Sequence, residues 1–253
     1  MLNILVQKVC TVTMRVCGHC ASAGAFFIVL AGLLLALPVA AVASAGTYDG
    51  NQSAPAGNEA AHDSETIIHI LALGDSLTAG YGLEEADSYP AVLQRKLTES
   101  GWPVKVVNAG VSGDTSAGGL ARVGWALGAV PEGKVDLVIV GLGANDALRG
   151  LPPQALRKNL AGIVEQCLSH GARVLLVGMQ APRNMGADYA QQFDAVYPDL
   201  ADKYNIALYP FLLEGVALDP DMNLKDGMHP NAEGVKEIVK RLSPAVVKEL
   251  EKL

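Results

Sequence analysis

The sequence predicts an α/β domain in which a five-stranded parallel sheet lies between two layers of helices. Apolar runs of strand length alternate with amphipathic segments of helix length from about residue 66 to the C-terminus, and this alternation is typical of parallel sheets. The runs are also apolar nearly throughout, as expected for strands that helices cover on both faces. The expected architecture is a three-layer α/β/α sandwich.

The first expected strand covers residues 67–73, an apolar run that stops at Gly74-Asp75-Ser76. Small, turn-forming residues end a strand abruptly. Ser76 is therefore held at the carboxyl end of a strand, and in open α/β sheets ligands bind in the crevice outside those ends. A serine in such a turn can also be only a turn former or a helix cap, so position alone does not assign it a function.

The remaining elements follow the same alternation. Helices are indicated by apolar residues three or four apart, by Pro in the first turn and by Gly after the last turn. Pro198 is expected to kink or interrupt its helix, because it lacks an N–H. In chain order we expect a helix over 89–100 capped by Ser88, a strand over 104–107, a helix over 117–129 capped by Thr115 or Ser116, a strand over 135–140, a helix over 153–170, a strand over 173–177, a helix over 188–204, a strand over 206–209 and an amphipathic helix after Pro230.

Residues 1–45 have the pattern of a secretory signal peptide. They contain two basic residues and no acidic residue, with an uncharged apolar run at 25–37 and the cleavage pattern Ala43-Ser44-Ala45. Cleavage there would release an exported protein, periplasmic or secreted. A membrane anchor is the alternative, since residues 21–45 carry no charge and are long enough to span a bilayer.

Residues 46–65 are expected to form a flexible linker, because they are rich in small and polar residues and show no apolar periodicity. The folded domain is expected at residues 66–253. The chain has a net charge of −7, and loss of the leader with its two positive charges would make it −9. An acidic surface is unsuited to a phosphate backbone, so no nucleic-acid partner is expected.

Cys17-Gly18-His19-Cys20 has the spacing of a thiol-disulfide oxidoreductase motif. That chemistry needs the first cysteine at a helix start after a strand, whereas this motif lies in the basic leader. Cys167 is then the one thiol of the mature chain, and its apolar helical stripe predicts a buried side chain. No His/Cys/Asp cluster has metal-ligand spacing and no glycine-rich phosphate loop occurs, so neither metal nor cofactor is expected.

Three short motifs follow predicted strands, and a fourth lies in a loop near the end of the chain. They are Gly74-Asp75-Ser76-Leu77, then Asn108-Ala109-Gly110-Val111-Ser112-Gly113-Asp114-Thr115, then Gly143-Ala144-Asn145-Asp146, and finally Asp226-Gly227-Met228-His229-Pro230. Together these four motifs resemble the SGNH (GDSL) hydrolase family and stand in the family's order, and the resemblance covers roughly residues 66–253. Stretches 76–81 and 145–150 are most similar to the exported acyl thioesterase, lysophospholipase and arylesterase type.

The resemblance implies a flavodoxin-like fold and a serine esterase that hydrolyses carboxylic esters or thioesters, among them acyl esters, lysophospholipids and aryl esters. The expected partner is a small acyl ester or a lipid substrate, with membrane contact only through an uncleaved leader. A carbohydrate O-deacetylase of the same family is an alternative. A non-catalytic binding module is another, because a fold does not fix a function.

The catalytic residues implied are Ser76, His229 and Asp226. A serine hydroxyl is a weak nucleophile until a base removes its proton, and the base needs a third group to fix its tautomer. Taken alone, His229 could be a surface histidine at a helix start and Asp226 a turn former. Of the five histidines in the chain, however, only His229 lies in a loop near the end of the domain.

The resemblance also implies three donors for the negative charge that builds on oxygen when an ester carbonyl is attacked. They are the backbone amides of Ser76 and Gly113 and the side-chain amide of Asn145. Ala144 stands where similar proteins often have Gly, which would alter the loop if a positive φ were needed there. No Gly-x-Ser-x-Gly elbow surrounds Ser76, which argues against an α/β-hydrolase fold. Four apolar residues could line an acyl channel or belong to the core: Leu77, Leu148, Leu151 and Met179.

Overall fold

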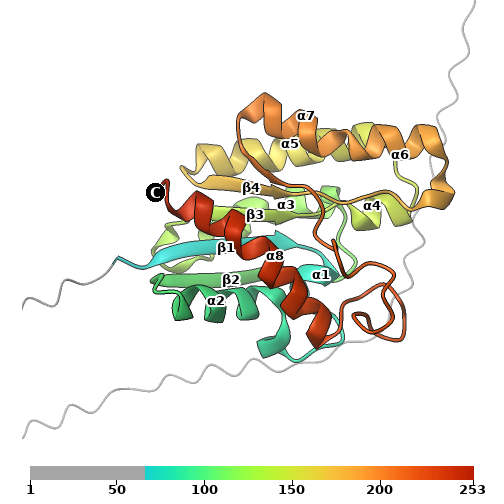
Figure 1. Ribbon diagram of the computed structural model, residues 1–253. Helices are drawn as coiled ribbons and strands as arrows, with labels where there is room; N and C mark the ends of the chain where they lie inside the picture. Colours follow the sequence, from blue (N-terminus) through green and yellow to red (C-terminus); the bar gives the residue numbers. More distant parts are fainter. Residues whose placement is uncertain (1–65) are drawn as a thin grey trace, which may run out of the picture. The chain divides into compact units, whose positions relative to one another are not determined.

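Five parallel strands form the central sheet of residues 66–253, the part of the chain that the computed structural model describes (Figure 1). The strand order is β2-β1-β3-β4-β5, which is the order of flavodoxin-like folds. The predicted fold class is therefore confirmed. The leader, the linker and the Cys17–Cys20 motif lie outside the described residues. The strands are β1 Ile68–Gly74, β2 Val104–Gly110, β3 Leu137–Gly141, β4 Arg173–Val177 and β5 Ala207–Tyr209.

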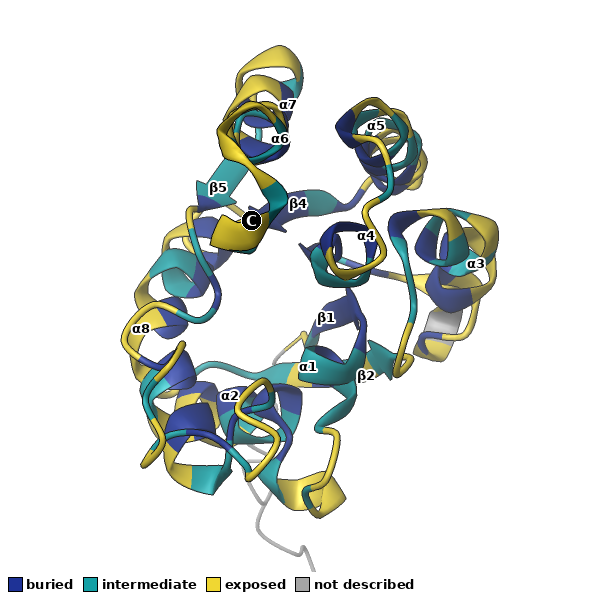
Figure 2. Cartoon of the chain, turned by 90° about the vertical axis from the view of Figure 1, so that its right-hand side faces the viewer, coloured by how far each residue is buried: buried dark blue, intermediate teal, exposed yellow. Residues whose placement is uncertain are grey.

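Helices cover both faces of the sheet (Figure 2). α2 and α8 pack against each other on one face, whereas α3, α5 and α7 lie together on the other. Within residues 66–253 no helix has the length and apolar character needed to span a bilayer. The helices are α1 Ser76–Ala79, α2 Tyr89–Glu99, α3 Ser116–Gly128, α4 Ala144–Leu148, α5 Pro153–Ser169, α6 Ala187–Asp194, α7 Val196–Tyr204 and α8 Ala232–Leu250, with short 3-10 turns at Glu85–Asp87, Pro131–Gly133 and Arg183–Met185.

The core lies between the sheet and these helices, as the apolar patterns predict. Every residue of β3 is buried, and in β4 only the first is not. The apolar stripe of α5 is fully buried, and burial raises the pKa of the Cys167 thiol to about 12, which makes it an inert hydrophobe. Residues of that stripe are Leu156, Leu160, Ile163, Val164 and Cys167.

One local prediction is wrong, for a physical reason. Ser88 does not cap α2 with its side chain, because its hydroxyl donates instead to the carbonyl of Glu85, 2.7 Å away. The expected interruption of the segment 188–204 is confirmed, because the segment forms two helices, with α6 ending at Asp194 and α7 beginning at Val196. Pro198 can offer no N–H to the carbonyl of Asp194, four residues earlier, and its ring would clash with that carbonyl in a continuous helix.

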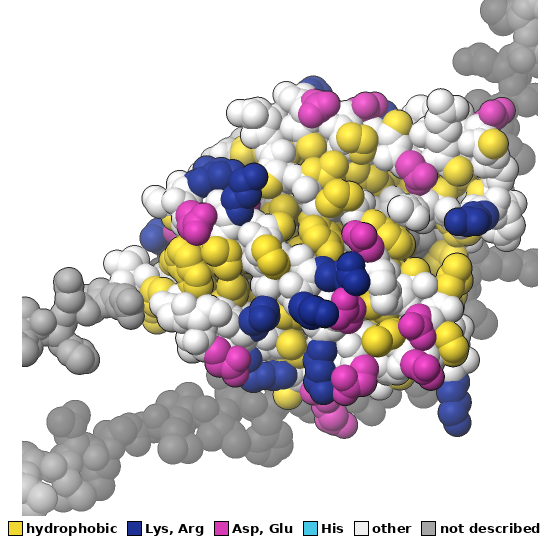
Figure 3. Space-filling view, in the orientation of Figure 1, with side chains coloured by type: hydrophobic (Ala, Val, Ile, Leu, Met, Phe, Trp, Pro, Cys, Tyr) yellow, Lys and Arg dark blue, Asp and Glu magenta, His cyan; other side chains and the backbone are white. Residues whose placement is uncertain are grey.

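Charged side chains of both signs alternate on the molecular face that carries α8 (Figure 3). Lys236 pairs with Glu233 and Arg241 with Glu237 on the helix surface, and exposed pairs of this kind contribute little stability. The pair of Arg173 with Glu249 differs, because the glutamate side chain is only 2% exposed. It fastens the C-terminal end of α8 to the first residue of β4.

The strands present their carboxyl ends at one edge of the sheet, where α1 packs directly on the backbone. Gly74 is in register with Gly110 on β2 and Gly141 on β3. A Cβ on Gly74 would lie 1.9 Å from Thr78 Oγ1, and one on Gly110 would lie 2.2 Å from the amide nitrogen of Ala79. Glycine at these strand ends therefore lets α1, which begins with Ser76, sit against the sheet.

Candidate active site

Ser76 is the first residue of α1 and follows β1 after a single intervening residue, Asp75. The Asp75 carboxylate caps the helix by accepting a hydrogen bond from the Leu77 amide at 3.0 Å. Helix α1 lasts only four residues and ends at Gly80, which adopts a left-handed φ of 79°. This strand-turn-helix junction holds the Ser76 side chain at the carboxyl edge of the sheet.

His229 and Asp226 reach Ser76 from the loop between β5 and α8. His229 Nε2 lies 2.9 Å from Ser76 Oγ, and His229 Nδ1 lies 2.7 Å from Asp226 Oδ2. The structure thus joins the three residues expected to act together in one hydrogen-bonded chain. An imidazole in this position can accept the proton of the serine hydroxyl while the carboxylate holds its other nitrogen.

The Asp226 carboxylate also shapes the loop that carries His229. Its Oδ1 accepts hydrogen bonds from the backbone amides of His229 at 3.0 Å and Met228 at 2.9 Å. These amides, together with the His229 imidazole, lower the pKa of Asp226 to about 2. The carboxylate therefore stays ionised throughout the pH range in which imidazole groups titrate.

Gly113 lies in a tight turn after β2. The Asp114 amide donates to the Val111 carbonyl at 3.1 Å, and Gly113 has a φ of 81°. This is the pattern of a type II turn, which requires positive φ at its third residue. Among the described residues, neither the Gly113 amide nor the Ser76 amide donates to a protein acceptor, so both are free to bind a ligand oxygen.

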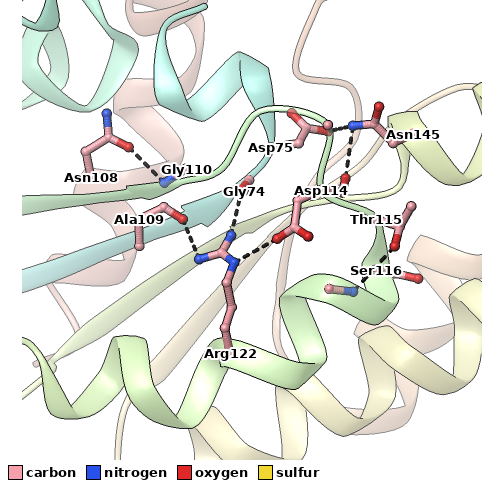
Figure 4. Close-up of polar contacts among 12 residues, drawn as sticks. Gly74, Asp75, Asn108, Ala109, Gly110, Asp114, Thr115, Ser116, Arg122 and Asn145 are labelled. Atoms are coloured by element: carbon pink, nitrogen blue, oxygen red, sulfur yellow. Dashed lines mark hydrogen bonds and ion pairs between the residues drawn. The ribbon is translucent and has the colours of Figure 1, made fainter. Parts of the chain in front are cut away.

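Asn145 lies in the first turn of α4, beside the Gly113 turn (Figure 4). Its Nδ2 donates to the Asp114 carbonyl at 2.9 Å and lies 3.4 Å from Asp75 Oδ2. The amide of Asn145 is therefore oriented by one residue from the Gly113 turn and one from the Ser76 turn.

Ala144 does not distort this loop, because it is the first residue of α4. The positive φ, 125°, belongs to Gly143. A Cβ on Gly143 would come within 2.1 Å of the Tyr197 hydroxyl, which donates to the Leu142 carbonyl. Glycine is needed at 143 and not at 144.

Asp75 is a buried carboxylate, only 1% exposed. Burial raises its pKa to about 6, although the Leu77 amide and the positive charge of His229 lower it. The raised pKa means that the fold holds the ionised form of Asp75 at a cost in stability. Such groups concentrate at functional sites.

The four apolar residues considered for an acyl channel lie in different surroundings. Met179 is buried in the core at 6% exposure. Leu77 is partly buried and packs against the core. Leu151 is half-buried, whereas Leu148 at the end of α4 is 58% exposed. Of these four residues, only Leu148 is exposed at the surface.

Sequence reasoning missed two polar groups that hold these loops. Asp146 accepts from the Ser116 hydroxyl at 2.5 Å and from the Ser116 amide at 2.8 Å, which ties α4 to the start of α3. Thr115, not Ser116, supplies the cap of α3. Arg122 bonds Asp114 and two strand-end carbonyls. Asp114 lies in the turn before α3, so helical spacing gave no signal for its pairing with Arg122.

Known proteins that are similar to this chain belong to one family. Residues 72–236 match the model of the GDSL-like Lipase/Acylhydrolase family. Esterase TesA of Pseudomonas aeruginosa is 41% identical to the chain over 177 residues, 70% of the chain and 87% of that protein. The protein named thioesterase 1/protease 1/lysophospholipase L1 of Escherichia coli K12 is 39% identical over 183 residues, 70% of the chain and 84% of that protein.

A solved structure gives the same result. AlinE4, described as an SGNH-hydrolase family esterase, shares 50% sequence identity and a TM-score of 0.62 over 73% of this chain and 97% of its own. Within residues 66–253 no group of three or more His, Cys, Asp or Glu side chains is placed to hold a metal ion. The chain belongs to the GDSL-like lipase/acylhydrolase family, the SGNH hydrolases, which are serine ester hydrolases.

Proposed function

We propose that the chain hydrolyses carboxylic esters or thioesters through an acyl-enzyme formed on Ser76, with His229 as the base and Asp226 as its orienting partner. The observation that carries the proposal is the hydrogen-bonded chain from Asp226 Oδ2 through His229 to Ser76 Oγ, with separations of 2.7 and 2.9 Å. Distances in this range permit direct proton transfer.

In the first half of the reaction, Ser76 Oγ attacks the carbonyl carbon while its proton passes to His229 Nε2. Collapse of the tetrahedral intermediate breaks the bond to the leaving alcohol or thiol, which takes the proton from His229. In the second half, water attacks the acyl-enzyme and gives a proton to His229. The carboxylic acid leaves and Ser76 regains its proton. The ionised Asp226 stabilises the imidazolium in both halves.

The amides of Ser76, Gly113 and Asn145 are proposed to bind the oxyanion of each tetrahedral intermediate. Within residues 66–253 the Ser76 and Gly113 amides have no protein acceptor, which supports this role. Asn145 Nδ2 donates one hydrogen to the Asp114 carbonyl at 2.9 Å, and its second hydrogen, which faces Asp75 Oδ2 across the longer distance of 3.4 Å, is the one proposed to bind the oxyanion. One such donor typically contributes about 100- to 1,000-fold in rate.

The substrates proposed are esters and thioesters of acyl chains, lysophospholipids and aryl esters. The name of the E. coli relative, which includes thioesterase and lysophospholipase, supports this range. We also propose that the protein is exported to the periplasm or secreted, from the signal-peptide pattern of residues 1–45. Mass spectrometry of the protein purified from cells tests this, since cleavage after Ala45 leaves Gly46 as the first residue. An intact leader would favour the membrane-anchored alternative.

The decisive experiment compares the wild type with Ser76→Ala on 4-nitrophenyl esters of increasing chain length, palmitoyl-coenzyme A, lysophosphatidylcholine and acetylated xylan. Ser100→Ala, an exposed serine at the end of α2, is the matched control. We expect Ser76→Ala to fall to background while the control keeps full activity. Equal activity of Ser76→Ala would refute the proposal. Turnover of acetylated xylan alone would favour the deacetylase, and no turnover at all the binding module.

A further inference from the structure

Arg122 bonds three segments that meet beneath the proposed oxyanion site. From α3, its Nε donates to Asp114 Oδ2 at 2.7 Å, and its two terminal nitrogens donate to the carbonyls of Ala109 and Gly74, each at 2.8 Å (Figure 4). Gly74 is the last residue of β1, two residues before Ser76. Ala109 lies near the end of β2, before the Gly113 turn. One guanidinium therefore fixes both strand ends and the turn.

Asp114 connects this guanidinium to the proposed oxyanion donors. Its carboxylate accepts from Arg122, its amide closes the Gly113 turn, and its carbonyl accepts from Asn145 Nδ2 at 2.9 Å. A Cβ on Gly118 would lie 1.8 Å from Asp114 Oδ1, so the absence of a side chain at 118 allows the carboxylate to lie against α3. Any displacement of Asp114 would move Gly113 and Asn145 together.

The charge of Arg122 matters as well as its hydrogen bonds. The Asp114 side chain is only 13% exposed and the Arg122 side chain 19%. Without the guanidinium, the Asp114 carboxylate would be an unpaired and largely buried anion close to the point where a second negative charge develops. Like charges in a partly desolvated site repel strongly. Pairing with Arg122 offsets the negative charge of Asp114 and so removes this repulsion.

We infer that Arg122 is a positioning residue for hydrolysis, which holds Asp114 so that the Gly113 and Asn145 amides converge on the oxyanion. The inference rests on the proposed function. Arg122 would act through these donors without touching the substrate. Its loss should therefore lower kcat and leave KM nearly unchanged, because the interaction strengthens only in the transition state.

The test measures kcat and KM of Arg122→Met with 4-nitrophenyl butanoate, per Ser76 site counted by fluorophosphonate titration. We expect kcat to fall about 10- to 100-fold, less than for loss of a donor itself, and KM to stay within about twofold. Arg122→Lys should fall between the wild type and Arg122→Met, since an ammonium keeps the positive charge beside Asp114 but cannot reproduce the planar fork that spans three acceptors. A kcat equal to that of the wild type in Arg122→Met would overturn the inference.

A double-mutant cycle with Asn145→Ala separates positioning from a purely structural role. If Arg122 acts through Asn145 and Gly113, then Arg122→Met should lower the kcat of Asn145→Ala by only about threefold, because the effects of coupled residues do not add. If the kcat of the double variant fell by the product of the two single-variant factors, the inference would be overturned. A fall in the number of titrated sites with unchanged kcat per site, which is the signature of destabilisation alone, would also overturn it.

Arg173→Met is the matched control. It also removes an arginine from a buried carboxylate, Glu249, but at the opposite end of the strands. We expect a lower Tm and an unchanged kcat. The assay of Ser76→Ala separates the two hypotheses, because residual activity there refutes the proposed function itself. An inactive Ser76→Ala with a fully active Arg122→Met refutes only the role of Arg122.

Discussion

The imidazole ring of His229 lies against the phenol ring of Tyr81, with ring centroids 4.5 Å apart and planes tilted by 37°. Tyr81 follows Gly80 at the end of the turn that carries Ser76, so the contact joins the segment of the proposed nucleophile to that of its base. Tyr81 is itself 52% exposed. The ring contacts the imidazole that is proposed to become a cation, and an aromatic ring near a cation stabilises it.

Replacing Tyr81 by Leu should lower kcat by about two- to fivefold, which corresponds to the roughly 0.5–1 kcal/mol of an exposed cation–aromatic contact. Tyr81→Phe should keep the wild-type rate, because it retains the ring that contacts His229. Steady-state kinetics on one ester measure both variants. Equal rates for all three proteins would show that the ring contact does not assist catalysis.

Asp226→Asn should lower kcat by about 10,000-fold while the protein stays folded, because an amide does not hold the imidazole in the required tautomer or stabilise its cation. Since the pKa of Asp226 is about 2, the wild type keeps this charge from pH 4 to 8. A loss of wild-type activity within that range therefore reports another group. Kinetics with circular dichroism provide the measurement.

Asp219→Asn is the control for that variant. Asp219 lies in the same loop, and its carboxylate also accepts a hydrogen bond from an amide two residues later, at 2.9 Å. Within residues 66–253 its carboxylate has no hydrogen bond to His229, so we expect unchanged kinetics. If both variants lost activity alike, the loop fold rather than the Asp226 charge would be responsible.

Gly113→Ala should impair both stability and catalysis. A Cβ on Gly113 has room, with its nearest neighbour 3.8 Å away, so the penalty comes from the left-handed backbone and amounts to about 1–2 kcal/mol. Relief of that strain would rotate the Gly113 amide away from the oxyanion and lower kcat. Gly171→Ala, with a φ of 88° and no neighbour within 4 Å, carries the same backbone penalty outside the site.

Thermal unfolding and kinetics on this pair distinguish the two effects. Both variants should lose roughly 2–4 °C in Tm per kcal/mol, as expected for a domain of this size. Only Gly113→Ala should lose kcat. A loss of kcat in both variants would assign the effect to general destabilisation.

The sequence was sufficient for the fold because strand and helix periodicities are local. The apolar run after His69 and the stripe of α5 each show which face is buried, without knowledge of neighbours. The predicted cap of α2 was wrong because the Ser88 hydroxyl had another acceptor, the carbonyl of Glu85 three residues earlier. The break caused by Pro198 was expected, but it falls before the proline because the ring acts on the carbonyl of Asp194, four residues earlier.

The residues of the candidate site were predictable only as a set. Ser76 and His229 are 153 positions apart, and no local pattern shows that they meet; resemblance to a family supplied that information. Arg122 could not be recognised in this way. Its three acceptors are a side chain and two backbone carbonyls on different strands. Every residue has a backbone carbonyl, so the sequence does not show which carbonyls accept a hydrogen bond.

Asp75→Asn should make stability less dependent on pH. Burial raises the pKa of Asp75 from 3.8 to about 6, so the folded protein binds this proton more tightly than the unfolded chain does. As the pH rises from about 4 to about 6, the unfolded chain releases the Asp75 proton before the folded protein does. The free energy of unfolding of the wild type therefore falls over this range. The loss amounts to about 3 kcal/mol above pH 6, at about 1.4 kcal/mol per pH unit.

Asparagine cannot ionise, yet its Oδ1 can still accept the Leu77 hydrogen bond that caps α1. We therefore expect Asp75→Asn to equal the wild type in stability near pH 4 and to exceed it near pH 8, as measured by urea unfolding at both values. Activity should fall, because the amide introduced at position 75 cannot accept from Asn145 while its oxygen caps the helix. If the free energies of unfolding of the wild type and Asp75→Asn ran parallel from pH 4 to 8, Asp75 would not be an anion destabilised by burial. If the two profiles diverged and the kcat of Asp75→Asn were reduced, the site would retain the charge of Asp75 for catalysis at the expense of stability.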